Sequence, residues 1–591
     1  MIRLSRFLKP YIWMLILLVV FVYLQVMANL QLPDYMAHIV NNGILAGDMT
    51  TLYQSGAMML LFTLAGGTCA VIVGFLASRI ATGAARDIRK KLFTKVESFS
   101  IHEFNTFSTS SLLTRSTNDI QQLQMTTALL FRMALMAPMS AIGGLQKALG
   151  MAPALSWIII SAVATLLTIV VALFWVGVPK FKLMQKLVDK LNLVTRENLT
   201  GLRVVRAFNN EAREEEKFRI ANAELTRVNL FVNRIMTLMQ PAMMLILSLS
   251  SLAIIWFGAH LINSGDLQIG NMLAFMQYTM NVIMAFMLIS MIFIMFPRAS
   301  VSANRIADVL QVDPTIHDPA TPIAINTNGQ GRIDFKDVTF NYPGADLPVL
   351  TGINFTAMPG ETTAFIGSTG SGKSTLINLV PRFYDVSAGQ ILIDGVDIRQ
   401  LKLEELYRQI GYVPQKGVLF SGTVKSNITY GNPDISTTEI EKSATIAQAT
   451  EFINNLEQQY NSEIAQGGSN VSGGQKQRLS IARALAVKPK VYIFDDSFSA
   501  LDFKTDMLLR EALIEETKGK TVLIVGQRIS TIANADKIIV LNEGKIVGEG
   551  THEELLKTNK VYREIAYSQL SDEELQSVEL HKPEPVGKEL Q

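Results

Sequence analysis

Residues 367–375 read GSTGSGKST, and this stretch decides the fold of the second half of the chain. It follows the strand-like run TTAFI and precedes the helix-like run LINLV, which is the context that the pattern G-x-x-x-x-G-K-[ST] requires. The glycines let backbone N–H groups turn toward phosphate oxygens, and the start of the helix adds positive potential. We therefore predict that Lys373 contacts the β- and γ-phosphates of a nucleotide and that the Ser374 hydroxyl contacts Mg²⁺. A chance glycine-rich turn is the alternative, which the strand-to-helix context disfavours.

A second stretch, VYIFDDSFSALD at 491–502, places carboxylates at the end of another apolar run. The run ends at Asp495, the usual position of a Walker B carboxylate that holds Mg²⁺ through its water shell. The alternative is an aspartate that only caps the following element. Beside a phosphate-binding loop, the metal role for Asp495 is favoured.

Between these two stretches lies NVSGGQKQRLSIARAL at 470–485. Ser-Gly-Gly-Gln at the start of a helix makes a second phosphate-binding helix N-terminus in the same domain. One domain has no use for two such sites on one γ-phosphate. Two domains that face each other head to tail do, because each of these segments then closes the phosphate-binding loop of the other domain.

The region around these motifs alternates short β-type runs with helical stretches from Ile333 onward, and this pattern predicts an α/β domain with a largely parallel sheet. We place this nucleotide-binding domain at 331–570, after a linker at 311–330 and before a polar C-terminal tail at 571–591. The strand-like runs are IDFKDVTF, TTAFIG, VYIFDD, TVLIVG and KIIVL.

The first 310 residues are much more apolar, and they raise the hydrophobic share of the chain to 49% while only 18% of residues are charged. Six apolar runs each reach the roughly 20 residues that a helix needs to cross a hydrocarbon core. We predict a membrane bundle of six helices near 11–31, 58–80, 128–149, 153–177, 241–263 and 271–296. The first run is too long for a signal peptide, and the stretch MIRLSRFLK before it is suited to lie along the inner membrane surface.

Charge in the connections orients this bundle. Segments 28–57 and 260–270 contain no Lys or Arg, whereas 79–91 and 180–234 are rich in both. The positive-inside rule therefore places both termini in the cytoplasm. The formal net charge of +2 gives no reason to expect nucleic acid as a partner.

The two basic connections have few helix breakers, and their helical periodicity continues beyond the apolar runs. We expect two helical hairpins that project about 25 Å from the membrane, since a helix rises about 1.5 Å per residue. Their tips are predicted near 116–124 and 207–216. Disordered loops are the alternative, which the amphipathic pattern disfavours.

Taken together, these motifs resemble those of ATP-binding cassette (ABC) transporters. GSTGSGKST, the loop YVPQKGVLFSGTVKSNI, VSGGQKQR, FDDSFSALD and GQRISTI occur in the order of that family. The stretches TRSTNDIQQLQ and ENLTGLRVVRAFNNE resemble the intracellular loops of its type IV exporters. The resemblance therefore covers nearly the whole chain. It implies a transmembrane α-helical bundle, six helices with long cytoplasmic extensions, fused to an α/β P-loop nucleotide-binding domain.

The resemblance also implies roles for individual residues, with ATP and Mg²⁺ as cofactors. Tyr342 is expected to stack on adenine, with a core aromatic as the alternative, and Asp502 to communicate between two ATP sites. Gln415 is expected to reach Mg²⁺ or the attacking water, so that Ser374, Gln415 and Asp495 hold the metal. ATP would lie on Gly367, Ser368, Thr369, Gly370, Ser371, Gly372, Lys373, Ser374 and Thr375. The segment of Ser472, Gly473, Gly474 and Gln475 would contact ATP held by a partner.

Two residues depart from the family pattern. Asp496 stands where the family usually has the catalytic Glu, and Gln527 stands where it usually has the switch His. The shorter carboxylate retreats by about 1.5 Å from the water, and a misplacement of about 1 Å can cost on the order of 10²-fold in rate. Glutamine cannot carry the imidazolium charge that stabilises a transferring phosphoryl group. Both losses fall on the site built on this chain's own P-loop, which is therefore predicted to be degenerate.

This asymmetry resembles heterodimeric multidrug exporters of Gram-positive bacteria. It implies a second ABC half-transporter subunit as partner, hydrophobic small molecules as cargo, membrane lipid as surroundings and the bacterial cell membrane as location. A slow homodimeric ATPase, a lipid, lipopeptide or peptide exporter, and a nucleotide-gated channel remain alternatives. Candidate cargo contacts in the sixth run, for which ordinary helix packing is the leading alternative, are Met272, Phe275, Met276, Met280, Met284, Phe286, Met287 and Met291.

Overall fold

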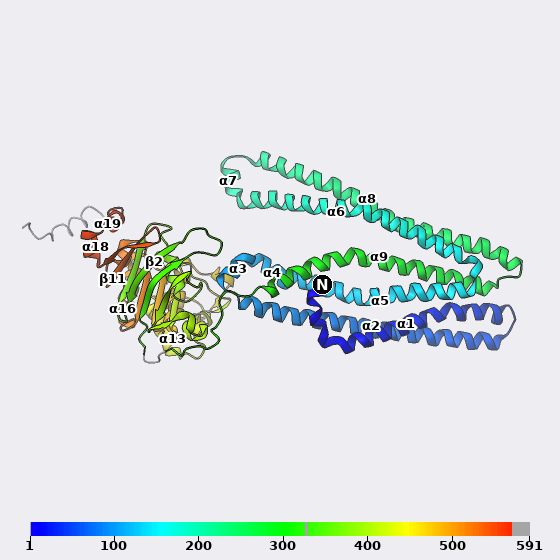
Figure 1. Ribbon diagram of the computed structural model, residues 1–591, viewed down its shortest axis with the longest axis horizontal. Helices are drawn as coiled ribbons and strands as arrows, with labels where there is room; N and C mark the ends of the chain where they lie inside the picture. Colours follow the sequence, from blue (N-terminus) through cyan, green and yellow to red (C-terminus); the bar gives the residue numbers. More distant parts are fainter. Residues whose placement is uncertain (1, 326–328, 570–591) are drawn as a thin grey trace, which may run out of the picture. The chain divides into compact units, whose positions relative to one another are not determined.

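The structure, a computed structural model shown in Figure 1, describes residues 2–325 and 329–569. It divides into two compact units. The helical unit comprises residues up to 97 together with 108–312, and the α/β unit comprises 98–107 together with the chain from 313 onward. The short segment 98–107, although it interrupts the helical unit in sequence, therefore belongs to the α/β unit. The predicted C-terminal tail at 571–591 lies outside the described residues.

The helical unit confirms the six predicted membrane helices. In the described part of the chain, six helices are long and apolar enough to cross a membrane. The stretch predicted to lie on the membrane surface forms a 3₁₀ helix over Ile2–Tyr11. The α-helices of this unit are α1 (Ile12–His38), α2 (Met49–Glu97), α4 (Thr109–Thr114), α5 (Ile120–Met151), α6 (Ser156–Thr200), α7 (Leu202–Ala207), α8 (Glu211–Asn263) and α9 (Ile269–Gln311).

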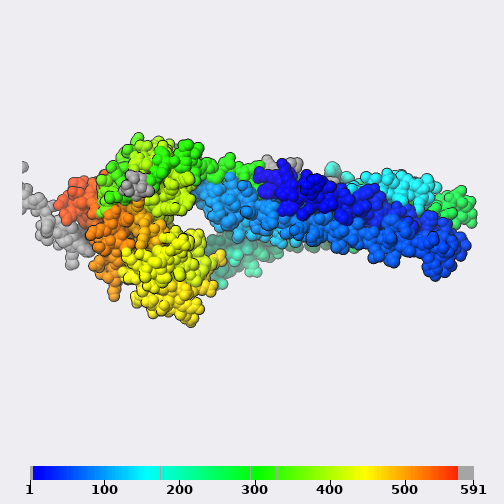
Figure 2. All heavy atoms as spheres, turned by 90° about the horizontal axis from the view of Figure 1, so that it is seen from below, coloured from blue at the N-terminus to red at the C-terminus, as the bar shows by residue number. Residues whose placement is uncertain are grey.

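Helices α1, α2, α5 and α9 share one apolar core, which includes Val22, Val73 and Phe275. Figure 2 shows α1 and α2, in blue, lying against each other. One polar cluster crosses this core. The Tyr278 hydroxyl lies 2.7 Å from both the Leu30 carbonyl and the Asp34 carboxylate, which share its one proton as acceptors. Asp34 also forms an ion pair with Lys147, so the lysine that interrupts the third predicted run is neutralised by a neighbouring helix.

The tip of the first hairpin lies earlier than predicted, so the expectation of 116–124 is wrong. After α2 ends at Glu97, the chain turns through 98–108, and Ser108 caps α4 by accepting from the Ser111 N–H. Residues Arg115–Asp119 continue the helix in π form directly into α5. They cannot form a tip because they are fastened to α9.

The fastening joins the TRSTND stretch to the end of α9. Asp119 accepts from the Ser302 hydroxyl at 2.9 Å and pairs with the Arg305 guanidinium at 3.2 Å. Arg115 donates in return to the Arg305 carbonyl at 2.7 Å. The motif that resembles an exporter intracellular loop therefore has a structural role, since it locks the first hairpin to the helix that leads into the linker.

Helices α6 and α8 form the second hairpin, with α7 at its tip. The chain turns through 201–210, which overlaps the predicted tip at 207–216 only in part, because α8 already begins at Glu211. The two helices share an apolar cluster with α9 that includes Leu166, Met243 and Ile283. In Figure 1 the end of this hairpin that carries α7 lies apart from α9.

The α/β unit contains the predicted parallel sheet. Its six strands lie in the order β12-β11-β3-β10-β9-β6, in which only β12 pairs in antiparallel fashion. The run IDFKDVTF is a strand as predicted, but it belongs to a separate antiparallel sheet with the order β2-β1-β4-β5. The strands are β1 (Ile333–Phe340), β2 (Leu350–Ala357), β3 (Thr362–Gly367), β4 (Ala388–Ile393), β5 (Val396–Asp397), β6 (Ile410–Val413), β7 (Gly422–Thr423), β8 (Glu463–Ile464), β9 (Val491–Asp495), β10 (Thr521–Val525), β11 (Lys537–Asn542) and β12 (Lys545–Gly550).

The helices of this unit pack on the sheets through buried aliphatic side chains such as Leu376, Leu479 and Ile529. Strands β3, β9 and β10 lie side by side and end at the same edge, which is where ligands bind in parallel sheets. The helices are α3 (Ile101–Phe107), α10 (Lys373–Leu379), α11 (Leu403–Arg408), α12 (Val424–Ile428), α13 (Thr437–Ile446), α14 (Thr450–Asn454), α15 (Gly473–Ala486), α16 (Phe503–Glu516), α17 (Ile529–Ile532), α18 (His552–Thr558) and α19 (Lys560–Tyr567).

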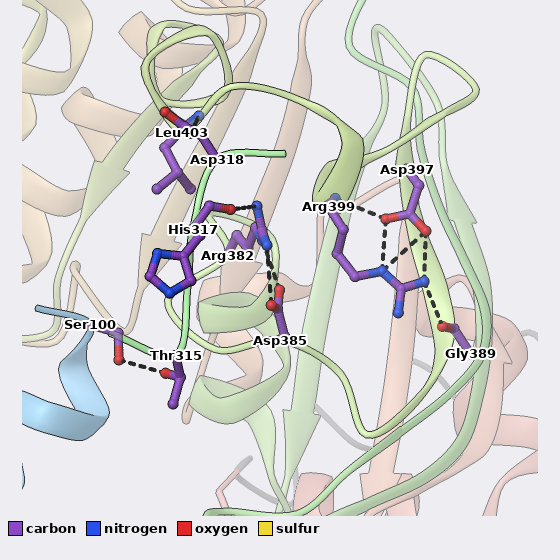
Figure 3. A network of polar contacts seen from close by, with 10 residues as sticks. All are labelled: Ser100, Thr315, His317, Asp318, Arg382, Asp385, Gly389, Asp397, Arg399 and Leu403. Carbon is purple, nitrogen blue, oxygen red and sulfur yellow. Dashed lines mark hydrogen bonds and ion pairs between the residues drawn. The ribbon is translucent and has the colours of Figure 1, made fainter. Parts of the chain in front are cut away.

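The linker is bound to the α/β unit by polar contacts, which Figure 3 shows. The His317 carbonyl accepts from Arg382 at 3.2 Å, and Arg382, itself buried, pairs with Asp385 at 2.7 Å. The Asp318 carboxylate accepts from the Leu403 N–H at 2.8 Å. The start of the linker therefore follows the surface of the unit instead of hanging free.

Segment 98–107 is joined to the same stretch of linker. The Ser100 and Thr315 hydroxyls lie 3.2 Å apart (Figure 3), and the buried Glu103 carboxylate accepts from the Thr315 N–H at 3.1 Å and from the Ser100 N–H at 2.8 Å. We call these three residues the Glu103 clasp. The clasp ties helix α3 to the α/β unit through the linker.

Candidate ATP-binding site

The GSTGSGKST loop connects β3 to α10 as the sequence predicts. Gly370 and Gly372 have φ angles of +84° and +97°, which side chains with a Cβ rarely adopt, so the loop can curl back on itself. The Lys373 Nζ lies across the loop and donates to the Gly367 and Ser368 carbonyls at 2.7 and 2.9 Å. The loop forms one wall of a cavity of about 650 Å³, and the predicted residues Gly367, Ser368, Thr369, Gly370, Ser371, Gly372, Lys373, Ser374 and Thr375 all line it.

The cavity places one ammonium group near two carboxylates. Burial lowers the pKa of Lys373, while the nearby carboxylates of Asp496 and Asp495 act in the opposite direction. The ammonium group is thus held in a partly desolvated place beside the backbone N–H groups at the start of α10. A polyphosphate there would replace the two carbonyls as the partner of Lys373.

Two of the three predicted metal ligands, Ser374 and Asp495, have oxygen atoms that suit a hard cation, whereas the Gln415 amide reaches Asp496 and its contact with a metal stays a prediction. The Ser374 hydroxyl donates to the Asp495 carboxylate at 2.8 Å, so a hydroxyl and a carboxylate oxygen meet at the mouth of the loop. Burial raises the pKa of Asp495, the hydrogen bond from Ser374 lowers it, and the net direction is upward. Oxygen ligands of these two kinds, completed by phosphate and water, suit Mg²⁺.

Asp496 has an arrangement that the sequence did not predict. Its backbone is left-handed, with φ +48°, and its Oδ2 accepts from the amide of Gln415 at 3.1 Å and from the amide of Gln527 at 2.8 Å. Burial raises the pKa of this carboxyl group, although the hydrogen bond from Gln415 lowers it. The two residues that depart from the family pattern therefore contact each other, and both reach the cavity.

Tyr342 lies beside the loop rather than in the cavity lining. Its hydroxyl is 2.9 Å from the Thr375 hydroxyl. Its ring meets Phe340 and Tyr384 edge to face, with centroids 4.9 and 5.3 Å away. This aromatic group holds Tyr342 beside the P-loop helix, and the stacking of its ring on adenine stays a prediction.

Residues 472–475, which were expected to contact ATP held by a partner and which we call the signature segment, stand at the start of helix α15. Ser472 and Gln475 form a capping box, in which the Ser472 hydroxyl accepts from the Gln475 N–H at 3.3 Å and the Gln475 side chain accepts from the Ser472 N–H at 2.8 Å. Ser472 and Gly473 are exposed, and a Cβ on Gly474 would lie 3.3 Å from the Ala500 carbonyl. Among the described residues that line the P-loop cavity, none comes from this segment.

Asp502 is also exposed and caps α16, where its carboxylate accepts from the Thr505 N–H at 3.0 Å. Hydrogen bonds from Thr505 hold the pKa of Asp502 below its ordinary value. The local structure therefore gives Asp502 a capping role, and its predicted role between two ATP sites stays a prediction.

The cavity also contains residues that sequence reasoning missed. Val349 and Val525 add apolar wall, and Ile565, Ser568 and Gln569 bring in the end of the last described helix. No phosphate-binding pattern marks these positions. Val525 ends β10, Val349 precedes β2, and the other three reach the cavity through the packing of α19 on the sheet.

Comparison with protein families matches both units. Residues 15–287 match the ABC transporter transmembrane region, and residues 350–499 match the ABC transporter domain.

Individual relatives match over nearly the full length. An uncharacterized ABC transporter ATP-binding protein of Mycobacterium tuberculosis is 41% identical over 96% of this chain and 97% of its own. A protein of the same description from Bacillus subtilis is 36% identical over 96% and 98% of the two chains. The ATP-dependent lipid A-core flippase of Syntrophus aciditrophicus is 33% identical over 88% and 86%.

Proposed function

This chain belongs to the ABC transporter family, and from that premise we propose that it forms one half of a heterodimeric exporter. It is a multi-pass membrane protein whose ATPase domain drives transport. In the proposed heterodimer, this chain's P-loop forms a degenerate site for Mg²⁺ and ATP, and its signature segment completes the competent site on the partner's P-loop. The cargo is hydrophobic or amphipathic, and the setting is the bacterial cell membrane with both termini in the cytoplasm.

The observation that carries the proposal is the pair of amide hydrogen bonds on Asp496. A fast site needs a carboxylate within reach of the attacking water and a group that can carry positive charge beside the transferring phosphoryl. Here the two amides orient Oδ2 of the short Asp496 side chain, and neither amide can carry a positive charge or accept the proton that the reaction releases. The arrangement suits a site that holds ATP and hydrolyses it slowly.

The signature segment supports a second chain. Ser472 and Gly473 are exposed at a helix N-terminus and do not line the cavity of their own domain. An exposed helix N-terminus with a glycine pair is suited to the γ-phosphate of a nucleotide carried by another subunit. Because this segment follows the family pattern while Asp496 and Gln527 do not, the partner is expected to carry Glu and His at those two positions.

Part of the methionine-rich run supports an adaptable cargo surface. Phe275 is fully buried, and Met272, Met276 and Phe286 pack against the core of the helical unit. Four methionines are exposed instead, at intervals of four, three and four residues, so they form one stripe on α9: Met280, Met284, Met287 and Met291. Flexible, polarizable side chains of this kind accommodate ligands of varied shape.

In the proposed cycle, ATP binding draws the two nucleotide domains together, and the helical hairpins pass this movement to the membrane helices. Lys373 binds the phosphates, and Gln415 and Gln527 orient Asp496. Ser374 and Asp495 would hold Mg²⁺, which would supply positive charge against the negative charge that develops in the reaction. Hydrolysis at the partner's P-loop resets the transporter.

A lipid is the second candidate cargo, because one relative is a lipid A-core flippase. Vesicles that contain the purified transporter separate the two. ATP-dependent uptake of a hydrophobic dye without movement of a labelled phospholipid supports drug export, and the reverse result supports lipid translocation. Flux of either probe down its gradient without ATP would favour a channel.

The subunit composition is tested by expressing the chain alone and together with a half-transporter from the same organism that has Glu and His at the two departing positions. We expect the pair to co-purify and to hydrolyse ATP at least about tenfold faster than this chain alone, since a misplaced catalytic group alone can cost on the order of 10²-fold. A lone chain that matches the rate of the pair would contradict the heterodimer.

A further inference from the structure

The C-terminal end of the described chain forms part of the nucleotide site. Helix α19 is anchored on the sheet by Tyr562, which is fully buried and whose hydroxyl lies 2.6 Å from the His552 ring, and by the buried Ala566. Beyond this anchor, Ser568 and Gln569 reach the P-loop cavity. The two residues that follow this well-packed helix therefore bring polar side chains to the ATP site, although they lie far from the P-loop in the sequence.

Gln569 makes two hydrogen bonds to one short loop. Its Oε1 accepts from the Ile529 N–H at 2.8 Å, and its Nε2 donates to the Gln527 carbonyl at 2.9 Å. A primary amide carries one acceptor and one donor side by side, so it can pair with a backbone C=O and a backbone N–H two residues apart. The contact therefore fixes the direction of the backbone from Gln527 to Ile529.

This loop carries the side chain that contacts Asp496. The Gln527 backbone is held by Gln569, while the Gln527 side chain donates to the Asp496 carboxylate at 2.8 Å. The hydrogen bonds form a continuous chain from α19 to the residue that replaces the catalytic Glu. A shift of the loop would move the Gln527 amide away from Asp496.

We propose that Gln569 is a positioning residue for the reaction on this chain's P-loop, where it acts by holding the loop that carries Gln527. Gln569 transfers no proton and contacts Asp496 only through Gln527. The proposal extends the proposed function, because it makes the rate of hydrolysis on this chain's P-loop depend on a residue that follows helix α19. It requires only that this P-loop binds ATP, so it stands whether the second subunit is a different chain or a copy of this one.

The experiment uses the full-length transporter and a photoreactive azido-ATP that is cross-linked to this polypeptide. The azido-ATP carries its label on the α-phosphate to measure binding or on the γ-phosphate to measure hydrolysis. The rate at which the γ-label is lost reports this chain's site even when a partner hydrolyses ATP faster. The variants are Gln569→Ala, Gln527→Ala and the double variant. Glu564→Ala, on an exposed position of the same helix, is the control for helix stability.

We expect Gln569→Ala to slow the loss of γ-label by about three- to tenfold with α-label binding within about twofold, because positioning affects the reaction more than the binding. Gln527→Ala should have the same effect, and the double variant should be no slower than Gln527→Ala alone, since residues that act through one path are not additive. Gln569→Glu, which keeps the acceptor and loses the donor, should resemble Gln569→Ala.

Two outcomes would overturn the proposal. If the effects of Gln569→Ala and Gln527→Ala multiply in the double variant, Gln569 acts independently of Gln527. If Glu564→Ala slows the loss of γ-label as much as Gln569→Ala, the helix contributes only stability. Both outcomes compare variants with one another, so they do not depend on how fast the wild-type chain hydrolyses ATP. That wild-type rate tests the proposed degenerate site separately.

Discussion

At the scale of single residues, the two positions that depart from the family pattern meet at one atom, the Oδ2 of Asp496. Asp496 and Gln527 are 31 positions apart, yet the amide of Gln527 donates to the oxygen of Asp496 that Gln415 also contacts. A longer carboxylate would place its oxygens elsewhere, and an imidazole would offer a different donor. The two residues are therefore joined directly by a hydrogen bond.

We accordingly predict that Asp496→Glu alone will not restore fast hydrolysis on this P-loop. The longer carboxylate gains reach toward the water, but Gln527 still provides no cationic group for the transferring phosphoryl. The double variant Asp496→Glu with Gln527→His should hydrolyse ATP at this site at least about tenfold faster than either single variant. Loss of the γ-label from this polypeptide measures both rates. Equal rates in Asp496→Glu and in the double variant would show that Gln527 does not limit hydrolysis at this site.

Tyr342 allows a second prediction at this scale, because its ring and its hydroxyl have separate partners. If the ring stacks on adenine, Tyr342→Phe should keep ATP affinity within about twofold and Tyr342→Ala should lower it by about fivefold, as expected for about 1 kcal/mol of stacking. Titration with a fluorescent ATP analogue measures both. Equal losses in the two variants would instead assign the effect to the hydroxyl contact with Thr375.

At the scale of elements, the Glu103 clasp explains how a seven-residue helix is held on the α/β unit. Burial by itself would raise the pKa of Glu103, but hydrogen bonds from Ser100 and Thr315 outweigh it, and the net pKa lies below the ordinary value. A carboxylate whose pKa is lowered in the folded state stabilises that state above the pKa of the unfolded chain. The stabilisation is lost as the pH falls through the lower, folded pKa.

We predict that Glu103→Gln will increase opening of residues 98–107 at neutral pH by about tenfold or more. A hydrogen bond to a charged group contributes about 1.5–3 kcal/mol, and the amide also replaces one acceptor with a donor that faces either the Ser100 or the Thr315 N–H group. Amide hydrogen exchange of the full chain measures the opening. Glu97→Gln, at an exposed position nearby, should leave the exchange unchanged.

The pH dependence of hydrogen exchange in residues 98–107 tests whether the charge of Glu103 is responsible. Wild-type exchange in this segment should approach that of Glu103→Gln only in acid, below about pH 4.5 where carboxyl groups of unfolded chains take up protons. A difference between the two proteins that persists unchanged in acid would show that the charge of Glu103 is not what holds α3.

At the scale of the whole molecule, the tip of the second hairpin carries apolar side chains that are mostly exposed in the part of the chain that the structure describes. Val204 and Phe208 are 60% and 73% exposed, and helix α7 has no buried residue among those described. Exposed apolar side chains at the end of a long hairpin mark an interaction surface. The proposed occupant is the partner subunit, whose presence the exposed signature segment also favours.

This surface gives a prediction about the assembled transporter. In a chain whose only cysteine, Cys69, has been replaced by serine, Phe208→Cys should react rapidly with a maleimide when the chain is alone. In the assembled pair the reaction should be at least about tenfold slower, because a buried thiol is shielded from the reagent. Glu215→Cys, at an exposed position on α8, should react equally in both samples. Equal labelling of Phe208→Cys in both would place the partner elsewhere.

The sequence by itself determined the family, the six membrane helices and the P-loop, because each depends on a local pattern. An apolar run must be about 20 residues long to cross a membrane, and a glycine-rich turn between a strand and a helix is recognisable from adjacent residues. The order of the motifs then determined the division into a membrane part and an ATPase part.

Only the tertiary structure decided which distant residues meet. The tip of the first hairpin lies at 98–108 instead of 116–124 because Asp119 is bound by Ser302 and Arg305 from α9, which no local pattern reveals. Likewise, Gln415 and Gln527 converge on Asp496, and Gln569 reaches the same site, because parallel strands and the helix packed on them end at one edge of the sheet. Periodicity specifies elements, whereas contacts across hundreds of positions depend on how the elements pack.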